Sequence, residues 1–272
     1  MKNRFIGGNK MLSTHSSTLK KFFTGNQLKI IAIIAMLIDH IATTIVWKLY
    51  LNASIVDGVH MMGDLIPEKA KQIYLIYMLM RIIGRLTFPI FAFMLVEGFL
   101  HTSNLKKYII RLFLFAILSE IPYDLSNSGR IIEFSGQNVI WTLLIGLVTL
   151  YFIKKYENHE TRKRKSLTIT FILLGGITAF LMQCDYSFGG ILLISILYIF
   201  RNQPKYLIIG EIIALSIIAL GFMWIQLFGL VSFILIRYYN KTVGRGNKYL
   251  FYIFYPLHLL ILGLISIFVF TS

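Results

Sequence analysis

Residues 29–50 of this chain read KIIAIIAMLIDHIATTIVWKLY. The stretch is apolar over about the 20 residues that a helix needs to cross a bilayer. Near its middle it carries two adjacent ionisable residues, Asp39 and His40. Ionisable groups at such a depth are costly and usually functional. One segment therefore predicts both a membrane helix and the first candidate site residues.

The composition of the whole chain agrees with a membrane protein. Of its 272 residues 57% are hydrophobic and 14% are charged, whereas soluble domains carry roughly 25% charged residues. The mean hydropathy is +0.72. These values exclude a soluble enzyme and a disordered chain. The first apolar run has no small-residue cleavage site after it, so we expect an uncleaved membrane helix rather than a signal peptide.

Eight further apolar runs follow, which predicts an all-α, polytopic membrane bundle of about nine transmembrane helices. The predicted spans are 29–50, 72–100, 107–124, 137–153, 166–183, 187–200, 205–220, 222–237 and 248–270. The sixth to eighth are short, and two could be re-entrant, so counts of eight and ten stay open. We expect a polar cytoplasmic arm over residues 1–28 and one membrane domain over residues 29–272.

The basic residues predict the orientation. The net charge is +15, and most of the 27 Lys and Arg lie between apolar runs on one predicted side. The other side keeps Lys48, Lys69, Lys71 and Arg130. This asymmetry favours a cytoplasmic N-terminus and an outer C-terminus, and it makes nucleic acid a poor candidate partner.

The single cysteine, Cys184, permits no internal disulfide and no cysteine metal site.

Several ionisable residues lie within or close to the predicted spans. Arg81 and Arg85 are four residues apart and so share one helix face, which calls for acidic partners or an anionic ligand. At about 1.5 Å per residue, His40, Arg85 and His258 lie near the midplane. We expect a polar cavity from the midplane to the outer surface, with these candidate substrate contacts: Glu120, Asp124, Asp185 and His258.

Neighbouring residues of a helix point about 100° apart, so Asp39 is not expected to orient His40. We expect Asp39 to pair with an arginine, and the orienting partner of His40 must come from another span. Structural roles stay open: His40 as a packing histidine, and the two arginines as part of a charge network. The basic loop 241–248 suits a topology signal, or a phosphate site through its glycines and cations.

The polar motifs resemble the TraX family, in the same order and over nearly the whole chain from about residue 28. They are Leu37–His40, Arg81–Phe99, His101–Asn104, Lys107–Leu112, Ser119–Asp124, Asn138 with Thr142–Leu143, Asp185–Tyr186 with Gly189–Gly190, and Lys248–His258.

The resemblance implies a function and a site. The family's namesake acetylates the amino terminus of pilin, and the family is similar to integral-membrane acyltransferases, in which an early-span histidine is essential and cytosolic acyl-CoA supplies the acyl group. It implies a multi-pass protein of the bacterial plasma membrane, with His40 as the catalytic histidine and Arg81 and Arg85 as the family's paired arginines. The acceptor stays open: a peptide amine, a sugar or another small molecule reached from the outer side.

The chemistry of acyl transfer suits these residues. Histidine has an ordinary pKa of about 6.5 and suits the base that takes the acceptor's proton. Arg81 or Arg85, held by Asp39, would stabilise the oxyanion. Lys241, Arg245 and Lys248 are the candidates for the phosphates of acetyl-CoA, and no metal is expected.

Two other classes of function remain. A transporter or flippase could use the same charged cavity, and a non-catalytic assembly partner is the third hypothesis. The acyl chain length, the oligomeric state and the choice between base and nucleophile for His40 stay open.

Overall fold

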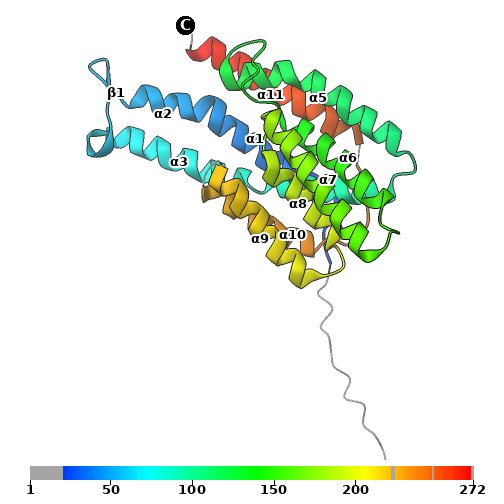
Figure 1. Cartoon of the computed structure of the whole chain (residues 1–272). Helices are drawn as coiled ribbons and strands as arrows, with labels where there is room; N and C mark the ends of the chain where they lie inside the picture. The colour runs from blue at the N-terminus through cyan, green and yellow to red at the C-terminus, as the bar shows by residue number, and fades with distance from the viewer. Residues whose placement is uncertain (1–20, 222–223, 247, 271–272) are drawn as a thin grey trace, which may run out of the picture.

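The computed structural model describes residues 21–221, 224–246 and 248–270 (Figure 1). Over these residues the fold is all-helical apart from one short hairpin of β1 (Ile55–Val56) and β2 (Val59–His60). The helices are α1 (Gly25–Ile41), the π-helix η1 (Ala42–Val46), α2 (Trp47–Ala53), the 3₁₀-helix η2 (Gly63–Leu65), α3 (Glu68–Gly84), α4 (Thr87–His101), α5 (Leu105–Ser128), α6 (Val139–Lys155), α7 (Thr161–Leu181), α8 (Ser187–Ile199), α9 (Pro204–Gly221), the 3₁₀-helix η3 (Trp224–Leu230), α10 (Val231–Arg237) and α11 (Lys248–Phe270).

Each predicted span coincides with one helix or with helices that follow one another directly. The first span is α1, η1 and α2 together, and the second is α3 with α4. The eighth is η3 with α10, except for residues 222–223, which lie outside the described part of the chain. Within the described residues, four helical stretches are long and apolar enough to cross a membrane: Gly25–Ala53, Glu68–His101, Thr161–Leu181 and Leu250–Phe270. The all-α membrane-protein fold is therefore confirmed at this level, while nine crossings and their orientation stay predictions.

The first helix begins earlier than the sequence predicts. Thr24 caps it, because its hydroxyl accepts a hydrogen bond from the Gln27 amide at 3.3 Å while the Gln27 side chain accepts one from the Thr24 amide at 2.9 Å. Residues 25–28 therefore belong to α1, and residues 1–20 lie outside the described part of the chain. The polar cytoplasmic arm stays a prediction. The 29 residues from Gly25 to Ala53 span about 43 Å, more than the hydrocarbon core of a bilayer.

The helices pack around a core at the centre of the bundle. Phe88 of α4, Leu147 of α6, and Leu193 and Ile194 of α8 are at most 1% exposed. α5 and α11 lie side by side, whereas α2 and α3 project beyond the bundle and end at the β-hairpin (Figure 1). The outward faces are apolar as well, for example at Leu174 of α7. An apolar exterior around a packed interior is what a bilayer environment favours.

Several basic segments meet at one end of the bundle. The amide of Gly25 donates to the Thr242 carbonyl at 2.8 Å, which joins the start of α1 to the loop after α10. The end of α6 meets the end of α8, since Arg201 lies 3.8 Å from the Glu157 carboxylate. Lys154 lies over the ring of Phe99 near the end of α4. Gathering cations at one end is what the positive-inside rule predicts.

Candidate functional site

A charge cluster joins α1 to the end of α3. The Asp39 carboxylate accepts hydrogen bonds from Arg81 Nη1 at 2.7 Å and from Arg85 Nη2 at 2.7 and 2.8 Å. The Arg85 side chain is 3% exposed, and those of Arg81 and Asp39 are 17% and 15% exposed. Both arginines come from the α3–α4 segment, and Asp39 comes from α1. Two guanidinium groups against one carboxylate leave a net positive charge within this trio.

The backbone at the end of α3 makes room for this cluster. The helix breaks at Arg85 and Leu86 before α4 begins, and Arg85 Nε donates to the Arg81 carbonyl at 3.0 Å. Gly84 packs directly against Asp39, because a Cβ atom at Gly84 would overlap the Asp39 side chain. A glycine at this position therefore lets the carboxylate reach both guanidinium groups.

The neighbouring His40 points to a different helix. Its Nδ1 lies 2.8 Å from Nε2 of His258 in α11, and Nδ1 of His258 lies 2.7 Å from the Phe254 carbonyl oxygen. Asp39 and His40 thus contact different partners, as the 100° offset between neighbours on a helix predicts. The partner of His40 comes from another span, and it is a residue that the sequence assigns to substrate binding.

The α1 helix changes its geometry directly after these two residues. The π-helical segment η1 begins at Ala42, and the Thr43 hydroxyl donates to the carbonyls of Asp39 and His40, each at 3.2 Å. π-Helical turns inside longer helices are frequent at functional sites. Here the turn lies immediately beyond the charged pair.

Two pockets meet at these residues. The larger has a volume of about 430 Å³ and the smaller about 140 Å³, and both are lined by Asp39, His40, Asp185 and Tyr186. The larger pocket follows α1 from Lys29 to His40, whereas the smaller one includes Thr43 on the far side. The shared residues therefore stand between two compartments.

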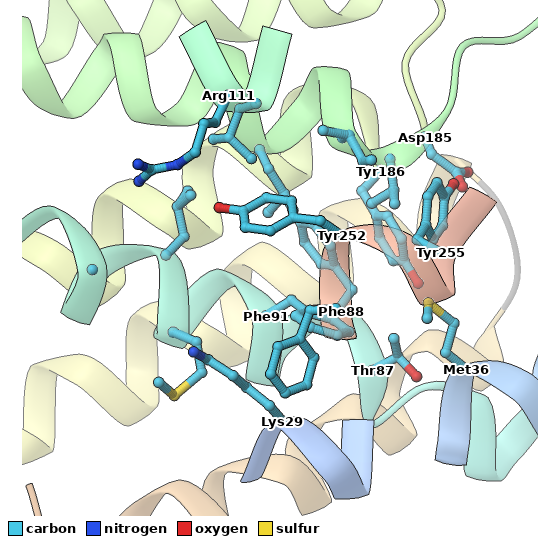
Figure 2. Close-up of a pocket in the computed structure, with 18 of the residues that line it drawn as sticks. Lys29, Met36, Thr87, Phe88, Phe91, Arg111, Asp185, Tyr186, Tyr252 and Tyr255 are labelled. Atoms are coloured by element: carbon cyan, nitrogen blue, oxygen red, sulfur yellow. The ribbon is translucent and has the colours of Figure 1, made fainter. Parts of the chain in front are cut away.

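The larger pocket has aromatic walls and a basic end. Figure 2 shows Phe88, Phe91 and Tyr252 along it, with Lys29 and Arg111 toward one end and Asp185 and Tyr255 toward the other. His101, Thr102 and Tyr108 also line it. His40 follows Lys29 by eleven positions, which is about 16 Å along a helix.

The smaller pocket is polar. Beyond the four shared residues it is lined by Thr43, Arg81, Arg85, Tyr123, Asn127 and Gln226. Gln226 belongs to the 3₁₀-helix η3, in a segment that the sequence treats only as a short span. The pocket is about a third as large as its neighbour, so it suits a small polar group.

The backbone near Asp185 is conformationally strained. Gln183, Tyr186 and Ser187 have φ values of 54°, 61° and 43°, a region that residues other than glycine rarely adopt. The Thr142 hydroxyl donates to the Asp185 carbonyl, and the Tyr186 ring stacks on Phe88 with centroids 3.8 Å apart. Strain of this kind concentrates at functional sites. With this backbone conformation, Asp185 and Tyr186 line both pockets.

Glu120 and Asp124, the other acidic candidates, lie outside both pockets. The Glu120 carboxylate accepts hydrogen bonds from the backbone and side chain of Asn138, the residue that caps α6. Asp124 Oδ2 accepts a hydrogen bond from the Glu133 amide at 2.9 Å. Their contacts hold the α5–α6 loop, and a role in substrate binding stays a prediction.

The basic loop before α11 also makes structural contacts. Besides the bond to Gly25, its Val243 carbonyl accepts from the Asn26 amide at 2.9 Å. Lys241 and Arg245 are exposed and lie outside the larger pocket, and the side chain of Lys248 is outside the described part of the structure. The phosphate site predicted there stays a prediction.

The cations that do line the larger pocket are Lys29 and Arg111. The sequence presents both as topology charges, since their positions resemble those of the other basic residues at span ends. Arg111 lies within the motif Lys107–Leu112, but the motif assigns it no role, and none of the motifs includes Lys29. Over the residues that the structure describes, no group of three or more His, Cys, Asp or Glu side chains could hold a metal ion.

Comparisons with known proteins give a family and one relative. The family model described as TraX protein matches residues 24–266. The chain is also similar to a protein of Dichelobacter nodosus named probable fimbrial assembly protein FimC, serogroup H1. The two are 28% identical over 266 residues, covering 88% of this chain and 94% of the relative. No solved structure matches the chain significantly.

Proposed function

This chain belongs to the TraX family, and from that premise we propose that it is an acetyltransferase of the bacterial plasma membrane. It moves an acetyl group from cytosolic acetyl-CoA to an amine or hydroxyl that arrives from the outer side. The observation that carries the proposal is the meeting of two pockets at His40. A reaction between substrates from opposite sides of a membrane needs such a meeting point.

The larger pocket suits the donor. With a cytoplasmic N-terminus, its Lys29 end opens toward the cytoplasm, where Lys29 and Arg111 offer charge-assisted hydrogen bonds to phosphate groups. The aromatic walls beyond them favour an extended, largely apolar arm. The distance of about 16 Å along α1 from Lys29 to His40 suits an extended pantetheine arm that ends in the thioester.

The smaller pocket suits the acceptor. The acceptor nitrogen or oxygen attacks the thioester carbonyl carbon, and His40 takes its proton. The C–S bond then breaks, and the departing thiolate takes the proton from His40. The positive trio of Asp39, Arg81 and Arg85 beside His40 supports stabilisation of the negative oxygen that develops on the carbonyl.

The name of the D. nodosus relative suggests a first acceptor. Because that protein is called a fimbrial assembly protein, the amino terminus of a pilin peptide is the acceptor to test first. A single terminal group also suits a pocket of about 140 Å³. Amino sugars and small hydroxyl compounds complete the acceptor panel.

The test is transfer of radiolabelled acetyl from acetyl-CoA by the purified protein in nanodiscs, with that panel present. We expect His40→Ala to abolish transfer, by at least about 100-fold, while it still inserts and binds acetyl-CoA. His159→Ala, which changes a histidine of the α6–α7 loop, is the matched control and should retain full activity. Full activity of His40→Ala would contradict the role of the histidine.

The same two pockets also suit a transporter, because they give one charged centre access from two sides. Vesicles separate the two functions. Uptake of an acceptor compound without acetyl-CoA, together with no acetyl transfer to any acceptor, would replace the transferase by the transporter.

A further inference from the structure

His258 makes two hydrogen bonds that together determine where its proton lies. Its Nδ1 is 2.7 Å from the Phe254 carbonyl oxygen, and its Nε2 is 2.8 Å from Nδ1 of His40. A carbonyl oxygen can only accept a hydrogen bond, so Nδ1 of His258 must carry the proton. In a neutral imidazole the other nitrogen is then an acceptor.

The tautomer of His40 follows from that of His258. Because Nε2 of a neutral His258 can only accept, Nδ1 of His40 must donate, and Nε2 of His40 is left with its lone pair. A neutral histidine side chain in water carries its proton mainly on Nε2. The contact with His258 therefore reverses the ordinary preference and leaves unprotonated the nitrogen that does not face α11.

We propose that His258 is the positioning residue that selects the reactive tautomer of His40; this inference rests on the proposed function. In the reaction, the acceptor's proton goes to Nε2 of His40. The proton on Nδ1 of His40 then lies in a 2.8 Å hydrogen bond to His258 Nε2, so the positive charge can be shared between the two rings. When the thiolate leaves, it takes the proton from Nε2 and the pair returns to its starting state.

The surroundings hold His258 in this orientation. It is 5% exposed, the Phe254 ring stacks on it at 4.7 Å between centroids, and Tyr255 meets it edge-on at 5.8 Å. A buried ring between two aromatic neighbours keeps its two nitrogens aimed at fixed partners.

A neutral orienting group suits this place electrostatically. In Ser-His-Asp triads a carboxylate holds the tautomer of the histidine. Here the one carboxylate adjacent to His40 in sequence, Asp39, is occupied by Arg81 and Arg85. A further carboxylate would bring another charge into the membrane interior at a cost, whereas a neutral His258 directs the proton without adding charge.

Nitrogen-15 NMR of histidine-labelled protein in nanodiscs tests the tautomer directly. The signals of the two rings are assigned by their absence from the spectra of His40→Ala and His258→Ala. We expect a proton on Nδ1 and a bare Nε2 for both residues. A proton on Nε2 of His40 in the unmodified protein would overturn the proposal.

Two variants test the consequence for activity. His258→Gln keeps an acceptor near the position of Nε2, while His258→Leu keeps a similar bulk without one. We expect His258→Gln to keep the His40 tautomer and to stay within about 10-fold of the wild-type kcat. His258→Leu should move the His40 proton to Nε2 and lose about 100-fold or more in kcat, with acetyl-CoA affinity unchanged in both.

The outcomes separate this inference from the proposed function. Equal activity of the Leu and Gln variants would overturn the positioning role while leaving the transferase intact. A complete absence of transfer by the wild-type protein would overturn the transferase, and the NMR measurement would still decide how the two histidines share their protons.

Discussion

Replacing Asp39 by asparagine would remove the carboxylate from two arginines while almost preserving its shape. The carboxylate accepts three short hydrogen bonds, two of them from Arg85, whose side chain is 3% exposed. Removing one partner of a buried ion pair leaves an uncompensated charge and costs about 3–5 kcal/mol. We expect a loss in this range, since all three side chains are well below one third exposed.

The measurement is reversible unfolding in mixed micelles, followed by circular dichroism. A double-mutant cycle then separates the two arginines. Asp39→Asn is combined with Arg85→Gln and, separately, with Arg81→Gln. The coupling of Asp39 with Arg85 should be larger, at about 1.5–3 kcal/mol, because that guanidinium makes two of the three bonds and is less exposed.

Exposed ion pairs are worth about 0–1 kcal/mol. If Asp39→Asn cost less than about 1 kcal/mol, or if the coupling with Arg81 exceeded that with Arg85, the cluster would not be the buried network inferred from the hydrogen bonds.

Two further predictions concern the space around Asp39 and the basic end of the larger pocket. Gly84→Ala should lower stability by about 1–3 kcal/mol, because the new Cβ would overlap the Asp39 side chain; unfolding in the same micelles measures it, and an unchanged stability would contradict the packing. Lys29→Gln combined with Arg111→Gln should raise the KM for acetyl-CoA about 10- to 100-fold at constant kcat. Lys106→Gln, an exposed charge outside the pocket, is the control, and a KM that responds equally to it would indicate general surface charge instead.

Much of the fold follows from the sequence because apolar runs in a membrane protein have to be helical. A backbone in hydrocarbon must satisfy its own hydrogen bonds, so each apolar run coincides with a helix or with adjoining helices. The pairing of Asp39 with an arginine was also predictable. Two cations on one helix face require an anion, and a carboxylate lies in the preceding span.

The pairing of His40 with His258 was not predictable in the same way. The residues are 218 positions apart, and no periodicity within α1 or α11 tells which helices lie side by side. The sequence predicts that both histidines lie near the midplane, which is a condition for contact but does not select a partner. The place of Gln226 in the smaller pocket was not predictable either. Gln226 belongs to η3, and the 3₁₀ geometry of that segment leaves no distinct apolar period in the sequence.

The sequence also cannot tell which basic residues line a pocket, and the reason is physical. A lysine that determines topology and a lysine that binds phosphate both belong at the cytoplasmic end of a helix. Lys29 and Lys106 are therefore equivalent in the sequence, although only Lys29 lines the larger pocket. Which side of a helix faces a cavity depends on its neighbours, so the proposed donor site could not be located from the sequence alone.

The adjacent pair Asp39 and His40 links these observations. Because neighbouring residues diverge by about 100°, one turn of α1 contacts α3 through Asp39 and α11 through His40. The charge cluster and the histidine pair thus determine the rotation of α1 about its axis from two directions. Inserting one residue before Asp39 would turn both side chains away from their partners together. The two pockets share their boundary at this pair, so the rotation of one helix governs where the two substrates of the proposed reaction can meet.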